Sequence, residues 1–296
     1  MRFGAALLLA CSIPVTVAAQ QSDRPALLGV WKADLSKSKI AGPPVTDYLM
    51  LVEQKTVVVN RRTGEKGTEF DEATGVKGQR GEQRSVLSFF PTGKPVVRYY
   101  QGVPNRITAA FSGNDLSLTA EVAGRPTVMK RSYVISPDGQ TLTLTVSQTG
   151  TAHDIQNTIV LLKQPDSAAE PLRAPEETAE KHYKNVKTEA LKDVPTSQFI
   201  DQMRYFAWSL GKDCEFCHVQ GKFDVDDKKE KKTAREMIKM TASINAGTFE
   251  GRQEVRCFTC HEMHTHPLSR PQFPDEIQNV PTAANASGTP VGSANR

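Results

Sequence analysis

The sequence predicts a two-part protein of the α+β class: an N-terminal antiparallel β barrel or sandwich, followed by a small, mainly helical domain. Its 296 residues exceed the roughly 100–200 residues of one compact domain. Short runs rich in Val, Thr, Tyr and Phe alternate with turn residues up to residue 164. Beyond residue 180 the apolar residues recur with a helical period of about 3.6.

The composition argues against one class of partner. Charged residues make up 24% of the chain and apolar residues 38%, which are ordinary values for globular domains. The net charge of +4 is spread along the chain. We therefore expect no nucleic-acid partner.

The N-terminus, residues 1–19, is expected to be a cleaved secretory signal. Arg2 precedes an apolar run, and Val17-Ala18-Ala19 resembles a cleavage site. A membrane-spanning helix is less favoured, because Pro14 interrupts a segment already shorter than the ~20 residues that a span needs. Acylation of Cys11, which would tether the chain to a membrane, is a second and less favoured alternative. We expect a periplasmic or extracytoplasmic protein.

Residues 26–164 are expected to form the β-rich domain. Hydroxyl and aliphatic residues alternate strictly in Thr141–Val146, which predicts one buried and one wet face. Pro137-Asp138-Gly139 combines a fixed φ with a residue that tolerates positive φ, as a tight turn requires. Trp31 is expected to fill the core, with a cavity-lining role as the alternative. The strongest predicted strands are residues 48–60, 96–100, 115–122, 128–135, 141–147 and 158–162.

The two ends of this region resemble small lipocalin-like domains of secreted bacterial proteins. The resemblance rests on Gly29-Val30-Trp31-Lys32, on Ser36-Lys37-Ser38-Lys39 and on Ser136 to Thr143. Residues 165–180, rich in Ala, Pro and Glu, are expected to be a linker, and residues 271–296 a disordered tail.

Two amphipathic helices are predicted in the remaining segment, residues 181–270. The first lies between Pro195 and Gly211, where Thr196 or Ser197 can cap its start and Gly211 suits the left-handed position past its end. Its apolar stripe consists of Phe199, Met203, Phe206 and Leu210. The second runs from about Lys229 to Ala246, and its stripe consists of Ala234, Met237, Ile238, Thr241 and Ile244, with Met240 at the edge.

Each predicted helix is followed by a Cys-x-x-Cys-His motif. In a c-type haem site two thiols add to the porphyrin, and the next histidine ligates the iron from the same turn. The sequence therefore predicts two covalently attached haem c groups. A four-cysteine zinc site or redox-active disulfides would not require a histidine after both pairs. The motif residues are Cys214, Cys217, His218, Cys257, Cys260 and His261.

The role of the helical methionines is left open by periodicity alone, because a methionine is ordinarily core filler. Here a resemblance adds to the residue pattern: residues 185–261 resemble the cytochrome subunit of bacterial photosynthetic reaction centres. That family places each haem parallel to a helix with a methionine ligand, followed by a turn and the motif. The resemblance implies that Met203 pairs with His218 and Met237 with His261. It is carried by Lys192-Asp193-Val194-Pro195, Phe199, Met203, Trp208, Ala234 to Thr241, Ile244-Asn245 and both motifs.

The sequence also departs from that family. The family's subunit binds four haems, its histidine between the second helix and motif has no counterpart near Gly251, and the β-rich domain is foreign to it. The resemblance therefore implies a dihaem relative and leaves a photosynthetic partner open. His264 and His266 could replace methionine as ligands but are expected at the surface, and no role is assigned to His153 or His182.

These patterns predict an electron-transfer protein with unidentified redox proteins as donor and acceptor, and not an enzyme. A methionine ligand raises the potential above that of bis-histidine ligation, which suits a high-potential acceptor. A dihaem peroxidase is the main alternative, and it would need one missing or mobile sixth ligand. A third hypothesis makes the β domain a ligand- or partner-binding centre. The run Lys228–Lys232 is expected to be a solvated helix start, with docking of an acidic partner as the alternative.

Overall fold

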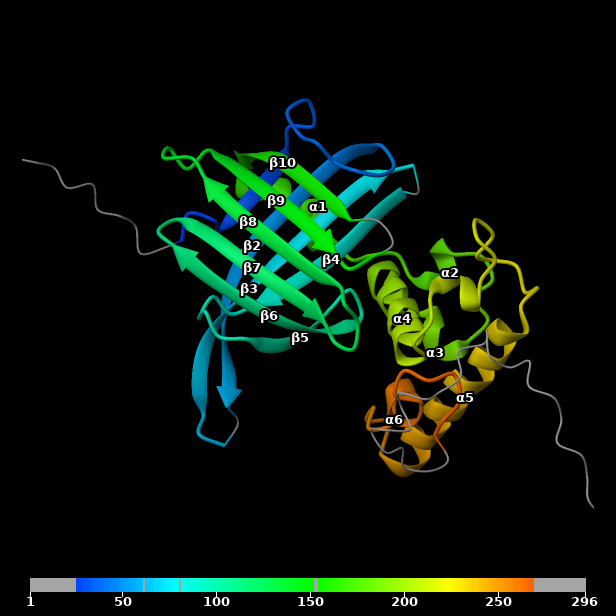
Figure 1. The fold of residues 1–296 in the computed structure, drawn as a ribbon. Coiled ribbons are helices and arrows are strands. Elements are labelled where there is room, and N and C mark those ends of the chain that lie inside the picture. Colours follow the sequence, from blue (N-terminus) through cyan, green and yellow to red (C-terminus); the bar gives the residue numbers. More distant parts are fainter. Residues whose placement is uncertain (1–24, 61, 80, 152–153, 269–296) are drawn as a thin grey trace, which may run out of the picture.

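The computed structural model of the protein describes residues 25–60, 62–79, 81–151 and 154–268. Figure 1 shows a β barrel and a group of helices, of which α4 (Thr196–Ser209) contacts strands β4 and β6 of the barrel. The predicted signal with Cys11, the residue His153 and the predicted tail lie outside the described residues.

Within the described residues, ten antiparallel strands form one sheet in the order β4-β3-β2-β1-β10-β9-β8-β7-β6-β5. The sheet curls into a nearly closed barrel, with β4 and β5 at its two edges (Figure 1). The prediction of a barrel or sandwich is thereby narrowed to a barrel. The strands are β1 Gly29–Ala33, β2 Val45–Asn60, β3 Glu65–Gly78, β4 Gly81–Phe89, β5 Val96–Tyr100, β6 Val103–Ser112, β7 Asp115–Val122, β8 Val128–Ile135, β9 Thr141–Thr149 and β10 Ile155–Gln164.

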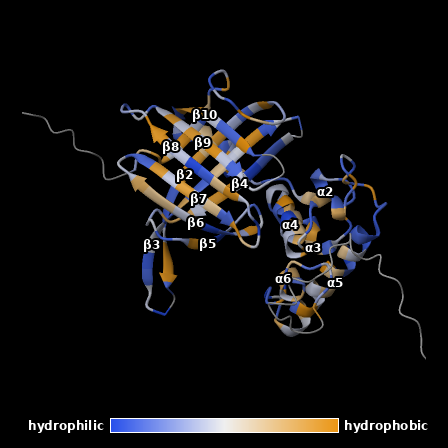
Figure 2. Ribbon diagram, viewed as in Figure 1, coloured by the Kyte–Doolittle hydropathy of each residue, from blue (hydrophilic) through white to orange (hydrophobic). Residues whose placement is uncertain are grey.

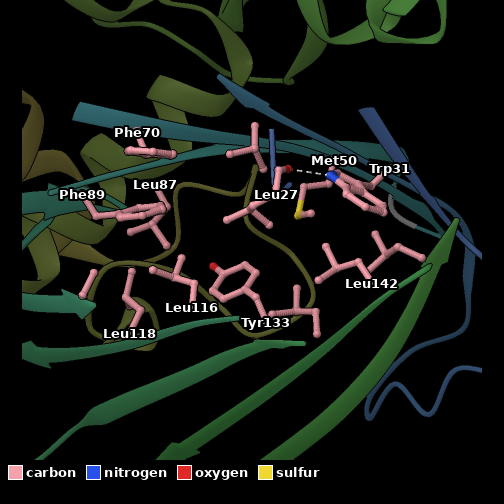
Figure 3. Close-up of a cluster of buried hydrophobic side chains, with 14 of the residues drawn as sticks. Leu27, Trp31, Met50, Phe70, Leu87, Phe89, Leu116, Leu118, Tyr133 and Leu142 are labelled. Carbon is pink, nitrogen blue, oxygen red and sulfur yellow. Dashed lines mark hydrogen bonds between the residues drawn. The ribbon is translucent and has the colours of Figure 1, made fainter. Parts of the chain in front are cut away.

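Apolar side chains from all around the sheet fill the barrel. Hydrophobic and hydrophilic residues alternate along the strands in Figure 2, which is the period-two pattern of a sheet with one buried face. Figure 3 shows part of the resulting core, in which Trp31 is fully buried and its indole Nε1–H donates to the Leu27 carbonyl at 2.8 Å. Trp31 therefore fills the core, as expected.

One polar cluster lies inside this apolar core. Glu72 is 2% exposed and Arg131 7% exposed, and the Arg131 Nη1 atom lies 2.7 Å from the Glu72 carboxylate. The Tyr133 hydroxyl donates to the other oxygen of Glu72 at 2.5 Å. The cluster joins β3 to β8 across the barrel, so these strands are tied together by charge as well as by packing.

The segment after β10, expected to be a linker, begins as part of the barrel packing. A 3₁₀ turn (Asp166–Ala169) and the short helix α1 (Glu170–Arg173) pack on the outside of the sheet. Ala169 is fully buried there, and Leu172 packs against the same small cluster as Val30 and Leu51. The chain becomes extended only at Ala174.

Both predicted long helices are present, and short elements surround them. α4 spans Thr196–Ser209, and α5 spans Lys229–Thr248. Gly211 has a φ of +63°, as expected for the residue past the end of α4. None of the described helices is long and apolar enough to cross a membrane. The short elements are α2 Ala179–His182, α3 Glu189–Lys192, the 3₁₀ turn Cys214–Phe216 and α6 Cys257–His261.

The start of α4 is capped by a residue from outside the helix. Thr196 and Ser197 were expected to accept hydrogen bonds from the first turn, yet neither makes a capping bond of that kind. Instead the Glu176 carboxylate accepts hydrogen bonds from the Ser197 N–H at 2.8 Å and from both hydroxyls. A free N–H at a helix start needs such an acceptor, and here an anion supplies it.

Candidate functional site

The two motifs lie on separate turns that both pack against α4. Cys214–Phe216 form a 3₁₀ turn, and Cys257–His261 form the single turn of α6. All four cysteines of the motifs are free thiols, of which Cys214 and Cys260 are exposed. Burial raises the pKa of the Cys217 and Cys257 thiols.

His218 of the first motif is held by the loop that follows it. Its Nδ1 donates to the Phe223 carbonyl at 2.9 Å, which leaves Nε2 as the free ring nitrogen. Burial lowers the pKa of His218, and the nearby Lys231, Arg235 and Lys228 cations lower it further, although the hydrogen bond to Phe223 acts in the opposite direction. Burial and these cations thus favour the neutral imidazole, which is the form that ligates a metal.

Lys231 fixes the loop that carries this carbonyl. It is 8% exposed, and its Nζ donates to the carbonyls of Phe223 and Val225, each at 2.9 Å. It also lies 3.4 Å from Asp226, whose pKa is held well below its usual range chiefly by Arg235, with Lys187 next. The expectation of a solvated lysine run is therefore wrong at Lys231, because its ammonium group donates hydrogen bonds to carbonyls of the loop.

His261 of the second motif is held in the same manner by a different partner. Its Nδ1 donates to the His264 carbonyl at 3.0 Å, so Nε2 is again the free nitrogen. The chain reverses just after His261, where Glu262 and Met263 have φ values of +45° and +66°. The side chains of His264 and His266 are exposed, in line with the surface positions expected for them.

Asn245 on α5 orders the segment that leads into the second motif. It is 8% exposed, and its side-chain amide pairs with both backbone groups of Val255, at 2.8 Å and 3.0 Å. Asn245 had no predicted role beyond its place in the resemblance. A polar residue directly after the last apolar position of the stripe, Ile244, was the available signal.

The predicted methionine ligands lie on exposed or half-buried helix faces. Met203 is half-buried on α4, the helix that packs on both motif turns. On α5, Met237 is 36% exposed, Met240 43% and Ile244 36%, so an apolar row on this helix faces outward. Both methionine ligand assignments stay predictions.

The residues present fit covalently bound haem. Each motif offers two uncommitted thiols on one turn, and each histidine has Nδ1 engaged by a carbonyl and Nε2 free. In the described part of the chain, no three His, Cys, Asp or Glu side chains gather into a metal site of their own. The residues that could hold haem therefore lie on two separate turns, each with two thiols and one histidine.

A helical segment with two such turns defines the class of c-type cytochromes. The chain belongs to the family described as the photosynthetic reaction centre cytochrome C subunit, which it matches over residues 136–289. The match begins before β9, so it covers the end of the barrel as well as the helices.

Comparison with solved structures gave two examples of similar chains. Fatty-acid-binding protein 1 of Echinococcus granulosus is 11% identical, with a TM-score of 0.30, over 47% of this chain and 98% of that one. Secretory abundant heat soluble protein 4 of Ramazzottius varieornatus is 14% identical, also with a TM-score of 0.30, over 50% of this chain and 100% of that one. The comparison with curated protein sequences gave no match.

Proposed function

We propose that this protein is an exported dihaem c-type cytochrome that carries electrons between redox partner proteins. The observation that carries the proposal is that His218 and His261 have the same hydrogen-bonding pattern. Each ring donates Nδ1–H to a backbone carbonyl and keeps Nε2 free. Such a second hydrogen bond fixes the tautomer and orientation of a metal-ligating histidine.

Haem c, when bound, supplies a one-electron iron couple whose potential depends on its axial ligands and surroundings. The chain's own residues determine those surroundings. The thiols of each motif would tether one group; His218 with Met203 would hold the iron of the first, and His261 with Met237 that of the second. Helix α4 packs on both motif turns, so the two sites share one helix as support.

An optical redox titration of the holoprotein, made in a host that attaches haem c, tests the proposal. We expect two low-spin haems and, in the oxidised form, the weak sulfur-to-iron band of methionine ligation. Met203→Ala and Met237→Ala should each remove about half of this band, since each of two sites supplies an equal share.

Met240→Ala is the matched control, because Met240 lies on the same helix as Met237 and is similarly exposed. It should leave the band unchanged. Loss of the band in Met240→Ala instead of Met237→Ala would reassign the second ligand. One high-spin haem in the wild type would contradict the electron carrier and favour the peroxidase.

A further inference from the structure

The turn between β7 and β8 of the barrel contacts the segments that flank both motifs. Three consecutive residues make these contacts. The Ala123 carbonyl accepts a hydrogen bond from the Trp208 indole at 2.8 Å, and Gly124 lies against Met263. Arg125 donates to the carbonyl of Lys212, two residues before Cys214, at 2.9 Å. One barrel turn thus reaches both haem-attachment regions.

Trp208 connects this turn to the second motif. The side chain is 5% exposed, and its indole stacks on the Phe258 ring with centroids 4.6 Å apart and planes 17° apart. Phe258 lies between Cys257 and Cys260. The hydrogen bond to Ala123 fixes one edge of the indole, so the barrel turn also restrains the ring on which Phe258 rests.

Gly124 connects the same turn to Met263, the residue before His264, whose carbonyl holds His261. It has a φ of +66°, and a Cβ at this position would overlap Met263 Sδ. The Met263 N–H donates to the Ser209 carbonyl of α4 at 2.9 Å. Glu262 and Met263 therefore keep a left-handed backbone between the barrel and α4, and such a conformation in residues with side chains persists only where the surroundings fix it. This reversal brings the His264 carbonyl within hydrogen-bond distance of His261 Nδ1.

The histidine of the first motif is held by a loop that α5 fixes. The Phe223 carbonyl that holds His218 is fixed by Lys231, which belongs to α5. The partners of the two histidines thus have different surroundings. Lys231 fixes the carbonyl partner of His218 from within the helical segment, whereas Met263, next to the residue whose carbonyl holds His261, lies against the barrel turn.

We propose that the β7–β8 turn positions His261 and thereby sets the reduction potential of the second haem. The inference rests on the proposed function, and it gives the barrel a role in tuning that haem. Ala123 and Gly124 act through Trp208, Phe258 and Met263, so they are positioning residues. Hydrogen bonds and packing behind a ligating histidine are known to tune the metal that it holds.

The test compares the midpoint potentials of both haems in the full-length holoprotein. Trp208→Phe removes the donor to Ala123 and keeps an aromatic ring, whereas Gly124→Val displaces Met263. We expect either variant to change the reduction equilibrium of the second haem about tenfold, which is about 59 mV for a one-electron couple. The first haem should keep its wild-type potential. The two ligand variants, Met203→Ala and Met237→Ala, identify which potential belongs to which haem.

Two further variants serve as controls. Arg106→Gln breaks an exposed ion pair with Glu121 on strands β6 and β7, and it should change neither potential. Lys231→Met should shift the potential of the first haem alone. Equal shifts of both haems in Trp208→Phe, or none, would overturn the proposal even if Gly124→Val fails to fold.

The failure of this inference differs from a failure of the proposed function. Intact mass of the wild type reports how many haems are attached. A chain without attached haem contradicts the function itself. Two attached haems whose potentials ignore the barrel variants contradict only the role of the turn.

Discussion

At the scale of single residues, Glu72 and Arg131 form a buried ion pair, and replacing only one of them should strongly destabilise the barrel. We expect Glu72→Leu to lower the free energy of unfolding by about 3–5 kcal/mol, because Arg131 would keep an unpaired charge in the core. The double variant Glu72→Leu/Arg131→Met should recover most of that loss, since no charge is left buried. Urea unfolding measures both.

Tyr133→Phe is the control for this pair, because it removes only the hydroxyl that donates to Glu72. Its expected cost is about 1.5–3 kcal/mol, the usual value of a hydrogen bond to a charged group. A double variant less stable than Glu72→Leu would show that the interior needs the ion pair and not merely charge balance.

Asn245 is the second residue whose role can be measured directly. Asn245→Ala leaves the N–H and the carbonyl of Val255 without their partner, at a cost of about 1–3 kcal/mol in unfolding free energy. We also expect faster proteolysis of the segment before Cys257. Ser243→Ala, an exposed position on the same helix, should change neither stability nor proteolysis.

At the scale of elements, the Glu176 cap makes the stability of α4 depend on pH. Burial raises the pKa of Glu176, but hydrogen bonds from Ser197 and Thr196 outweigh burial and place it below the ordinary 4.5. The folded state thus favours the carboxylate. Its contribution is fully present above the unfolded pKa of 4.5 and is lost as pH falls through the lower folded value.

Glu176→Gln should therefore destabilise the protein by about 1 kcal/mol near neutral pH, the usual worth of an N-terminal cap. The difference from wild type should shrink as the pH falls below 4.5. Unfolding in urea across a pH series measures it. Glu180→Gln, an exposed neighbour, is the control, and a difference that grows in acid would contradict the assigned cap.

Elements with a clear apolar period were predictable, and elements held by distant partners were not. The stripe of α4 and the alternation of β9 each follow from side chains close in sequence. β3 was not among the strongest predicted strands, because Glu69, Glu72 and Thr74 are buried in it and break the apolar pattern. The Glu176 cap was missed because acceptor and donor meet only after folding.

At the scale of the whole molecule, the candidate site also combines residues that a local sequence pattern predicts with contacts that form only on folding. The motif residues follow from local spacing, since one turn must present two thiols and an imidazole. The partners of His218 and His261 are backbone carbonyls, which no sequence pattern identifies. The contacts of Trp208 and Gly124 join residues more than eighty positions apart and depend on how barrel and helices pack.

The intact mass of the mature protein tests the proposed export and cofactor content together. We expect a chain that begins at Gln20 and carries the mass of two haem groups, because cleavage after Ala19 suits the signal pattern. Mass spectrometry of protein from a haem-attaching host measures it. A diacylated chain that begins at Cys11 would contradict soluble export.

The chain order of the β7–β8 turn has a consequence for biogenesis. The last strand of the barrel, β10, pairs with the first, β1, so all of the barrel strands precede both motifs in the chain. For the proposed export from the N-terminus, we expect domains to fold as units in order of appearance. The surface that receives Trp208 and Met263 would then already be formed when the second motif emerges. The barrel can serve as a template on which the attachment turn matures, and a barrel that folds slowly should delay maturation of the second haem more than that of the first.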